Sequence, residues 1–244
     1  MSKLVQKALD GLIRMVYPEK LTCNLCGREV FFGEAFCPEC AEKLEFITTR
    51  CDKCGRSSIK PVSVCSTCKT SLVDRARSVL NYSDDVIALI TSLKYRGKRY
   101  LAKVFAEMMS AVYAENFFCP DMITYVPMTD RDEFERGYNQ SEELAIELSK
   151  IVKAEVFDLL EKVKPTKNQV GLNYSERQKN LKGSFAIAKG AAVKGKKILV
   201  VDDVLTTGAT GNEIATVLKG KGAKSVFLLT IASVANVYER KDEE

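Results

Sequence analysis

The sequence of 244 residues contains no histidine. Without an imidazole, the protein cannot use a histidine-dependent catalytic triad or a histidine metal site, and proton transfer falls to a carboxylate, a lysine, a tyrosine or the substrate itself. Two common nucleotide-binding motifs are also absent, the P-loop pattern and a GxGxxG fingerprint after a strand. The remaining candidates for chemistry are acidic residues, cysteines and basic residues.

Long apolar runs are missing as well, and no stretch reaches the length of a transmembrane helix. Residues 2–17 are interrupted by charged side chains and no small-residue cleavage site follows, which argues against a signal peptide. Their apolar residues recur at helical spacing, which predicts an amphipathic helix over residues 1–20 that docks on the protein. We therefore expect a cytoplasmic protein without membrane insertion.

Eight of the nine cysteines form four CxxC pairs, and ten residues separate each pair from the next. Two CxxC knuckles can supply the four thiolates of a tetrahedral zinc site, and such a filled site is structural. A redox dithiol set is the alternative, but the regular spacing without a secretory signal disfavours it. We expect a double zinc ribbon over residues 21–72 with two zinc ions, whose ligands are Cys23, Cys26, Cys37, Cys40, Cys51, Cys54, Cys65 and Cys68.

Spacing alone leaves the pairing of the knuckles open, because sequential and cross-braced arrangements both fit. The ninth cysteine, Cys119, precedes Pro120 in an apolar stretch, which suggests a buried thiol and not a ligand.

From residue 86 onward, helical periodicity alternates with strand-like segments. The predicted helices are 86–109 with a break near Gly97, 141–152 and 209–221, and the predicted strands are 122–126, 156–160, 184–187, 197–202 and 225–231. This alternation predicts an α/β domain with a parallel sheet over residues 73–238. Residues 239–244 form a charged tail.

In the segment that starts at residue 197, a predicted buried strand is followed by two acids and then by a turn. Residues 198–201 are apolar without alternation, as in a central parallel strand. Asp202 and Asp203 can accept hydrogen bonds from vicinal hydroxyls or hold hydrated Mg²⁺. The following turn, with a glycine, hydroxyls and the start of a helix, can bind a phosphate; it consists of Thr206, Thr207, Gly208, Ala209 and Thr210.

A plainer alternative is that the two acids only end the strand and cap the helix. The order of apolar strand, paired acids, Thr-Thr-Gly-x-Thr turn and helix favours a ligand. This segment resembles the phosphoribosyl pyrophosphate (PRPP) loop of type I phosphoribosyltransferases. The resemblance implies that Asp202 and Asp203 hold the ribose hydroxyls and that Thr206 to Thr210 hold the 5′-phosphate.

A second candidate segment follows Pro127, where a loop leads to Arg136, Asn139 and Gln140 at the start of the next helix. A guanidinium fork with amide donors at a helix start suits pyrophosphate, although an ordinary capped turn has the same composition. Further along, the long polar segment from Lys164 to Lys182 is typical of a lid or a linker.

The formal charge of +5 falls to about +1 once eight thiolates bind two Zn²⁺ ions, so overall basicity says little about nucleic acid. One basic stretch, interleaved with tyrosines, suits a phosphate backbone and stacked bases; a solvated helix face is the alternative. Its nucleic-acid candidates are Lys94, Arg96, Lys98, Arg99 and Lys103.

The motifs occur in the order seen in the ComF/GntX family of competence-associated, phosphoribosyltransferase-like proteins. They are the paired CxxC knuckles, residues 93–97, residues 136–140, Thr166 with Gln169, Glu176-Arg177 with Asn180, and the Asp202-Asp203 loop. The resemblance implies a type I phosphoribosyltransferase fold behind the zinc ribbons and a role in handling single-stranded DNA during natural transformation. It also implies Mg²⁺ with PRPP as ligand and other DNA-uptake proteins as partners. By position, Arg136, Asn139 and Gln140 would lie in the pyrophosphate loop, and Gln169, Arg177 and Asn180 in a mobile loop.

Two function classes follow. In the first, the protein is a binding module whose PRPP site and basic surface serve competence. In the second, it is a phosphoribosyltransferase in which pyrophosphate leaves C1 of PRPP, Asp202 and Asp203 stabilise the positively charged transition state, and a nucleobase or amine attacks. No segment identifies the acceptor. A PRPP-sensing repressor is disfavoured because the N-terminal part has the zinc-ribbon pattern and not that of a helix-turn-helix.

Overall fold

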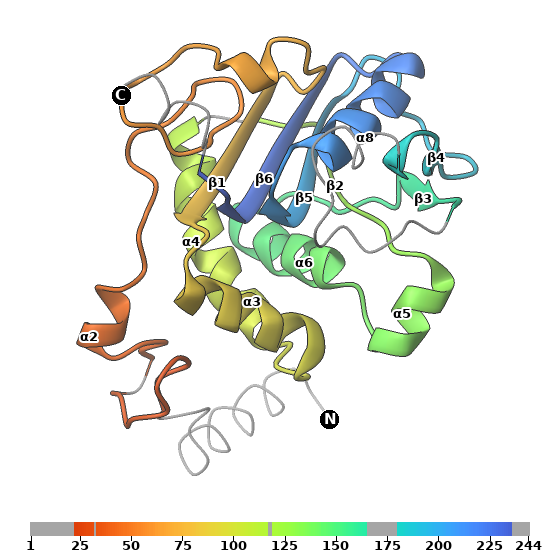
Figure 1. Ribbon diagram of the computed structural model, residues 1–244. Helices are drawn as coiled ribbons and strands as arrows, with labels where there is room; N and C mark the ends of the chain where they lie inside the picture. The colour runs from red at the N-terminus through yellow and green to blue at the C-terminus, as the bar shows by residue number, and fades with distance from the viewer. Residues whose placement is uncertain (1–21, 32, 117–118, 165–179, 236–244) are drawn as a thin grey trace. The chain divides into compact units, whose positions relative to one another are not determined.

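The computed structural model describes residues 22–31, 33–116, 119–164 and 180–235. The chain divides into two compact units, Met1–Leu44 and Glu45–Glu244. The first unit holds one pair of CxxC knuckles and the short helix α2 (Pro38–Ala41). The second unit holds the other pair of knuckles and a parallel sheet with its helices (Figure 1).

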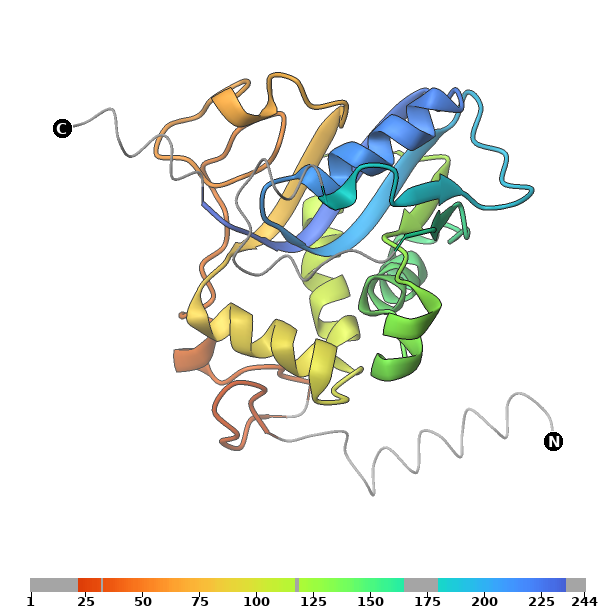
Figure 2. The ribbon, with the colours of Figure 1, turned by 45° about the vertical axis from the view of Figure 1, so that its right-hand side comes forward.

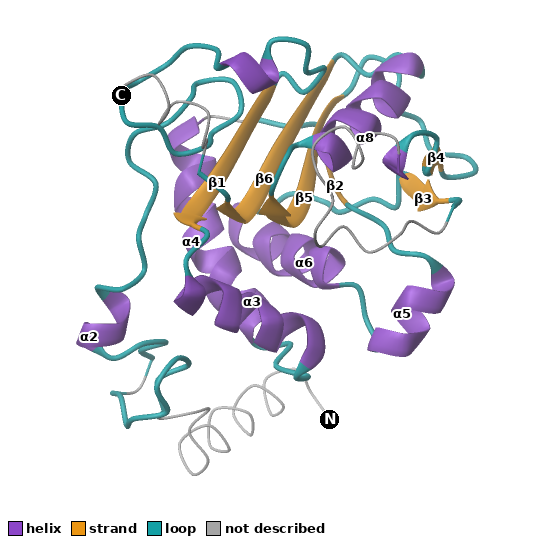
Figure 3. Cartoon of the chain, viewed as in Figure 1, coloured by secondary structure: helices purple, strands orange, loops and turns teal. Residues whose placement is uncertain are grey.

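Four parallel strands form the central sheet of the second unit in the order β1-β6-β5-β2 (Figures 1 and 3). In the register of the two inner strands, Lys197 lies opposite Ser225 and Leu205 opposite Ser233. Because the strands share one direction, their carboxyl ends share one edge of the sheet. The bounds are β1 Arg75–Asn81, β2 Met122–Tyr125, β5 Lys197–Leu205 and β6 Ser225–Ser233.

Helices cover both faces of this sheet (Figure 2). Helix α8 (Ala209–Gly220) packs on one face, and α4 (Leu101–Asn116) and α6 (Gln140–Val152) pack on the other. Helix α3 (Asp84–Tyr95) precedes α4, and α5 (Asp130–Arg136) precedes α6 in the chain. Within the described residues, no helix has both the length and the apolar composition that a membrane crossing needs.

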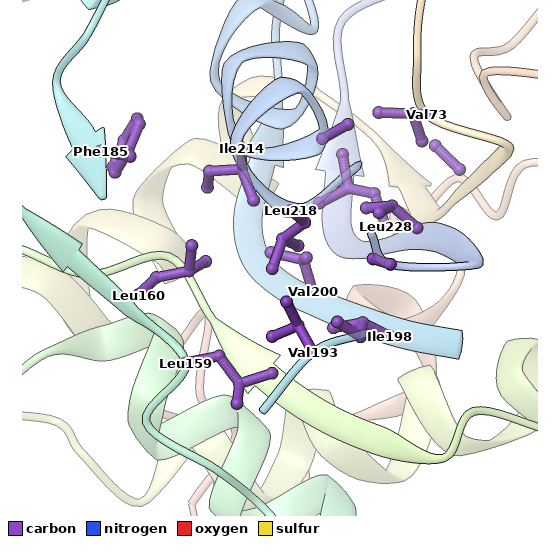
Figure 4. Packing of buried hydrophobic residues seen from close by; sticks show 14 of the residues in the cluster. Val73, Leu159, Leu160, Phe185, Val193, Ile198, Val200, Ile214, Leu218 and Leu228 are labelled. Carbon is purple, nitrogen blue, oxygen red and sulfur yellow. The ribbon is translucent and has the colours of Figure 1, made fainter. Parts of the chain in front are cut away.

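The hydrophobic core beneath α8 explains why residues 198–201 are uniformly apolar. Ile198 and Val200 of β5 meet Ile214 and Leu218 of α8, and none of the four side chains is more than 1% exposed (Figure 4). Their neighbours in β5 point to the opposite face, which α6 covers. Burial of each such side chain contributes about 1.5–3 kcal/mol to the free energy of folding. Because β5 is packed on both faces, its position and that of the turn that follows it are fixed.

A small hairpin lies beside this core. Its strands, β3 (Leu160–Lys162) and β4 (Phe185–Ile187), pair antiparallel. Phe185 is buried in the same core as α8. The hairpin is therefore packed on the face of the sheet that α8 covers.

The second zinc ribbon packs directly on strand β1. The Ala76 N–H donates to the Lys53 carbonyl at 2.8 Å, and the Arg77 guanidinium donates to the Asp52 carbonyl at 2.8 Å. Gly55 has φ +68°, and a Cβ atom there would lie 2.4 Å from the Ala76 carbonyl oxygen. Only glycine tolerates both the positive φ and the short distance to the Ala76 backbone, so Gly55 allows this knuckle to approach the strand closely.

Most predicted elements occur near their expected positions, including the break at Gly97, where φ is +65°. The sequence pattern does not predict strand β1, because two arginines interrupt its apolar residues. One of them, Arg77, is buried and contacts the ribbon and Asn116. The helix predicted over residues 1–20 and the tail at 239–244 lie outside the described residues.

Three expectations are wrong. The strand expected at 156–160 is displaced: Val156 makes only an isolated bridge, and the paired strand begins at Leu160. Helix α5 occupies part of the expected loop, because the Thr129 hydroxyl caps it by accepting the Asp132 N–H at 3.1 Å. Cys119 is exposed and not buried.

Candidate functional site

Each pair of neighbouring CxxC knuckles brings four sulfur atoms together. Within each group, all four Sγ atoms lie within 4.8 Å of one another. This geometry selects the sequential pairing over the cross-braced one. The groups are Cys23, Cys26, Cys37 and Cys40 in the first unit, and Cys51, Cys54, Cys65 and Cys68 in the second.

The sulfur positions fit tetrahedral zinc. Zn–S bonds of about 2.3 Å place two sulfurs about 3.8 Å apart, and the Sγ atoms are 3.7 Å apart in Cys26–Cys37 and 3.6 Å apart in Cys54–Cys65. In the first ribbon, hydrogen bonds from Arg28 lower the pKa of Cys26 to about 6, which favours the thiolate that a metal requires. Four sulfur ligands leave no open coordination position, so both sites are of the structural kind.

The acids Asp202 and Asp203 lie near the end of β5 and are held from two other elements. Gln140 Nε2 donates to Asp203 Oδ2 at 3.0 Å, and Ser141 Oγ donates to Asp202 Oδ1 at 3.0 Å. Both donors belong to the first turn of α6. From α3, Lys94 Nζ lies 2.6 Å from Asp203 Oδ2, which makes an ion pair whose carboxylate is almost fully buried.

This arrangement shifts the pKa of Asp202 and of Lys94. Burial and the adjacent Asp203 carboxylate raise the pKa of Asp202 to about 7, although Lys94 and Ser141 oppose the shift. Burial lowers the pKa of Lys94, but the Asp203 carboxylate outweighs it, so the net shift is upward. The site thus combines a stable ammonium–carboxylate pair with a carboxyl group that exchanges its proton near neutral pH.

Arg136 extends the network. Its Nη1 donates to Gln140 Oε1, and its Nη2 donates to the Tyr95 hydroxyl at 3.3 Å. The guanidinium carbon lies 4.8 Å from the centre of the Tyr95 ring, in cation–π contact. Since the Gln140 amide also bonds Asp203, it connects Arg136 to the acids. Gly137, at φ +84°, ends α5 directly after this arginine.

The turn after β5 bends at Gly208, which has φ +81° and occupies the N-cap position of α8. Thr207 Oγ1 accepts the Ala209 N–H at 3.3 Å. The helix behind the turn has twelve residues, and its N-terminal N–H groups carry partial positive charge. The hydroxyl-bearing residues are all partly exposed: Thr206, Thr207 and Thr210. The turn therefore has the features of an anion site.

Asn139 has a supporting position. Its Oδ1 accepts the Ser141 N–H at 3.0 Å, which caps α6, and its Nδ2 donates to the Val126 carbonyl at 3.0 Å. The residue is 1% exposed. Its amide thus fixes the start of α6, where Gln140 and Ser141 reach the acids.

Of the predicted mobile-loop residues, Asn180 lies in the described part of the chain, and Gln169 and Arg177 lie outside it. The Asn180 carbonyl accepts a hydrogen bond from Ser184 Oγ at 3.3 Å. A contact of these residues with a ligand stays a prediction.

The predicted basic cluster divides between two environments. Lys94 belongs to the acid site through Asp203, and Arg99 forms an ion pair with Glu143. The other three make no ion pair with any described residue and are at least partly exposed: Arg96, Lys98 and Lys103.

Two residues that contact the acids are not predicted as site residues from the sequence. One is Ser141, which directly follows Gln140 at a predicted helix start. The sequence pattern places Lys94 in a nucleic-acid surface, and only the folded structure reveals its partner, Asp203 of β5. A lysine within the family motif at residues 93–97 was the available signal for a site role.

Two family models match the chain. A double zinc ribbon domain covers residues 12–74, and a phosphoribosyl transferase domain covers residues 125–244. With the parallel sheet, the flanking helices and the two four-cysteine groups, these matches confirm the predicted type I phosphoribosyltransferase-like fold behind a zinc-ribbon module.

Similar proteins include two curated relatives. DNA utilization protein YhgH of Salmonella typhimurium is 30% identical over 213 residues, which cover 84% of this chain and 93% of that protein. Competence protein ComFC of Streptococcus pneumoniae is 32% identical over 197 residues, which cover 80% and 79%. Among solved structures, the glutamine PRPP amidotransferase from B. subtilis is 19% identical over 57% of this chain and 30% of that chain, with a TM-score of 0.41.

Proposed function

Because the chain belongs to the ComF family of phosphoribosyltransferase-like proteins with a double zinc ribbon, we propose that it binds Mg²⁺-PRPP and single-stranded DNA during DNA uptake. The relatives are named for competence and for DNA utilization, which supports a shared role in handling incoming strands. In this proposal the protein acts in the cytoplasm beside other DNA-uptake proteins.

The observation that carries the PRPP proposal is the chain of contacts from Arg136 through Gln140 to Asp203. It joins the Arg136 guanidinium to Asp203, one of the paired acids, which lies 67 residues further along the sequence. The acids match the vicinal hydroxyls of ribose, and Arg136 with Gln140 matches the pyrophosphate group. The turn from Thr206 to Thr210 follows the acids directly and matches the 5′-phosphate.

Magnesium fits the same donors. Mg²⁺ favours one or two carboxylates together with substrate phosphate oxygens, and Asp202 and Asp203 supply such carboxylates. When bound with PRPP, the ion would neutralise charge on the pyrophosphate group. Lys94 already neutralises Asp203 in part, so Asp202 is the carboxylate with the weaker cationic contact.

Single-stranded DNA fits the surface between α3 and α4. Arg96, Lys98 and Lys103 offer three cations that no described acid pairs with, and they suit a phosphate backbone. Tyr95 is 69% exposed, and base stacking on such a ring is worth about 1–3 kcal/mol per base. Because Tyr95 also contacts Arg136, this surface adjoins the proposed pyrophosphate site.

A second candidate, an active phosphoribosyltransferase, is favoured by one specific observation. Asp202 has a pKa raised to about 7 in a chain without histidine, so it can accept or release a proton beside the reacting ribose. Pyrophosphate release in the presence of nucleobases, amines or single-stranded DNA would identify this activity. Tight PRPP binding with no release would favour the binding module.

Calorimetry with Mg²⁺-PRPP tests the binding proposal. The double substitution Asp202→Asn with Asp203→Asn should abolish binding and leave the fold intact. A matched control is Asp84→Asn with Asp85→Asn, an adjacent acid pair at the start of α3 that should leave the affinity unchanged. Equal affinity in the wild type and the Asp202/Asp203 variant would refute the proposed site.

A further inference from the structure

Arg56 in the second zinc ribbon is a buried cation that pairs with no carboxylate of the described residues. It is 7% exposed, and its Nη1 donates to Thr67 Oγ1 at 3.3 Å. Its Nε is buried and has no hydrogen-bond partner in the described part of the chain. A buried guanidinium of this kind is costly unless an anion completes its hydrogen bonds.

The guanidinium faces the turn that ends β5. Arg56 Nη2 lies 3.4 Å from the position that a Cβ atom would take on Gly208. Both residues line one cavity of about 40 Å³, which has room for roughly three water molecules. The other polar side chains around this cavity are those of Lys53, Thr67, Thr70, Ser71, Thr207 and Asn212, and the zinc ligands Cys54 and Cys68 also line it.

The Arg56 guanidinium and the N-terminus of α8, whose N-cap is Gly208, therefore place two positive groups at this cavity. Lys53 also lines the cavity, and its Nζ donates to the Ser71 carbonyl at 2.8 Å. The repulsion between the guanidinium and the helix N-terminus is relieved when an anion lies between them. Helix N-termini bind phosphate through backbone N–H groups, and arginine binds it through two parallel hydrogen bonds.

We infer that Arg56 and the Gly208 turn together bind a phosphate monoester, namely the 5′-phosphate of PRPP. The inference rests on the proposed PRPP site and adds to it a ligand from the zinc ribbon, outside the acid and pyrophosphate positions. The ribbon then serves a binding role besides folding.

The ribbon fixes the position of this arginine. The Cys51 N–H donates to the Arg56 carbonyl at 3.0 Å, and Gly55 packs against the backbone of Ala76. Thr67, the hydrogen-bond partner of Arg56, lies between two zinc ligands of the same site. Loss of the second zinc should therefore weaken 5′-phosphate binding.

Calorimetry on the full chain with two probes tests the inference: ribose 5-phosphate, which carries only the monoester, and Mg²⁺-pyrophosphate, which lacks it. Arg56→Gln should weaken ribose 5-phosphate binding by about tenfold or more and leave Mg²⁺-pyrophosphate affinity within about twofold. Arg56→Lys, which keeps the charge but loses the fork, should be intermediate. Lys60→Gln, an exposed cation of the same ribbon, is the matched control and should bind like the wild type.

Zinc content and thermal melting show whether each variant keeps its ribbon. If Arg56→Gln loses zinc, Arg56→Lys provides the test. The proposal requires this variant to bind ribose 5-phosphate more weakly than the wild type and to keep its affinity for Mg²⁺-pyrophosphate. Two results would overturn the role of Arg56: unchanged ribose 5-phosphate affinity in a zinc-replete variant, or an equal loss of affinity for both probes. The proposed function would still stand if the wild type binds Mg²⁺-PRPP. A wild type that binds neither probe nor Mg²⁺-PRPP would instead remove the proposed function itself.

Discussion

Lys94 Nζ lies 2.6 Å from Asp203 Oδ2, so the end of α3 supplies the cation for Asp203, the buried member of the adjacent acid pair. Two neighbouring carboxylates repel each other in a poorly solvated site, and a nearby ammonium relieves the repulsion for one of them. Gln140 also donates to Asp203, and burial together with the adjacent carboxylate raises the pKa of Asp202 to about 7.

Removal of the ammonium should destabilise the protein. We expect Lys94→Met to lower the free energy of unfolding by about 3 kcal/mol at pH 7, because a buried carboxylate loses its partner. Urea denaturation of the zinc-loaded protein measures the loss. Lys98→Met should cost less than about 0.5 kcal/mol, and Lys94→Met combined with Asp203→Asn should recover most of the stability. A loss in Lys94→Met no larger than that in Lys98→Met would show that the ion pair does not stabilise the fold.

The raised pKa of Asp202 predicts a pH dependence of stability. Between about pH 4 and pH 7 the folded protein holds a proton on Asp202 that the unfolded chain has released, so this group makes stability fall as pH rises through that window. Asp202→Asn removes the titration. The stability of this variant relative to the wild type should therefore rise by more than about 1 kcal/mol from pH 5 to pH 7. Urea denaturation at a series of pH values measures the difference, and a constant difference would contradict the raised pKa.

The two cysteine groups predict two zinc ions per chain. Cys65→Ser should reduce the zinc content by one, because three sulfur ligands and a hydroxyl bind zinc more weakly than four sulfurs. Cys119→Ser is the matched control and should retain both ions, since Cys119 is exposed and outside both groups. Metal analysis after dialysis gives the count. Full zinc content in Cys65→Ser would exclude the proposed ligand set.

Single-strand binding should depend on the cations between α3 and α4. Replacement of Arg96, Lys98 and Lys103 by alanine should weaken binding and reduce the slope of log affinity against log salt by about 2, since each phosphate contact contributes about 0.7. Fluorescence anisotropy with an unstructured oligonucleotide at several salt concentrations measures both.

A control with the same loss of charge distinguishes this surface from general basicity. Alanine at the exposed residues Lys189, Lys194 and Lys196 should leave the slope nearly unchanged. The same reduction in both triple variants would mean that the contact lies elsewhere.

Local sequence patterns predicted much of the fold. The apolar run at 198–201 identified a strand covered on both faces, and Gly97 marked the break between α3 and α4. Strand β1 escaped prediction because Arg77 looks like a surface residue until the ribbon and Asn116 bury it. Helix α5 escaped because its seven residues bury no side chain and therefore show no apolar stripe.

The sequence by itself determined the chemical parts of this protein: four CxxC pairs, the acids Asp202 and Asp203, and the glycine turn after them. These features depend on residue type and short spacing, so the local sequence is sufficient to identify them. Tertiary structure alone decided which parts meet. It paired neighbouring knuckles, turned Lys94 toward Asp203 and brought Arg56 to Gly208. Such contacts join residues far apart in the chain, and only the packing of helices and ribbon on a shared sheet brings them together.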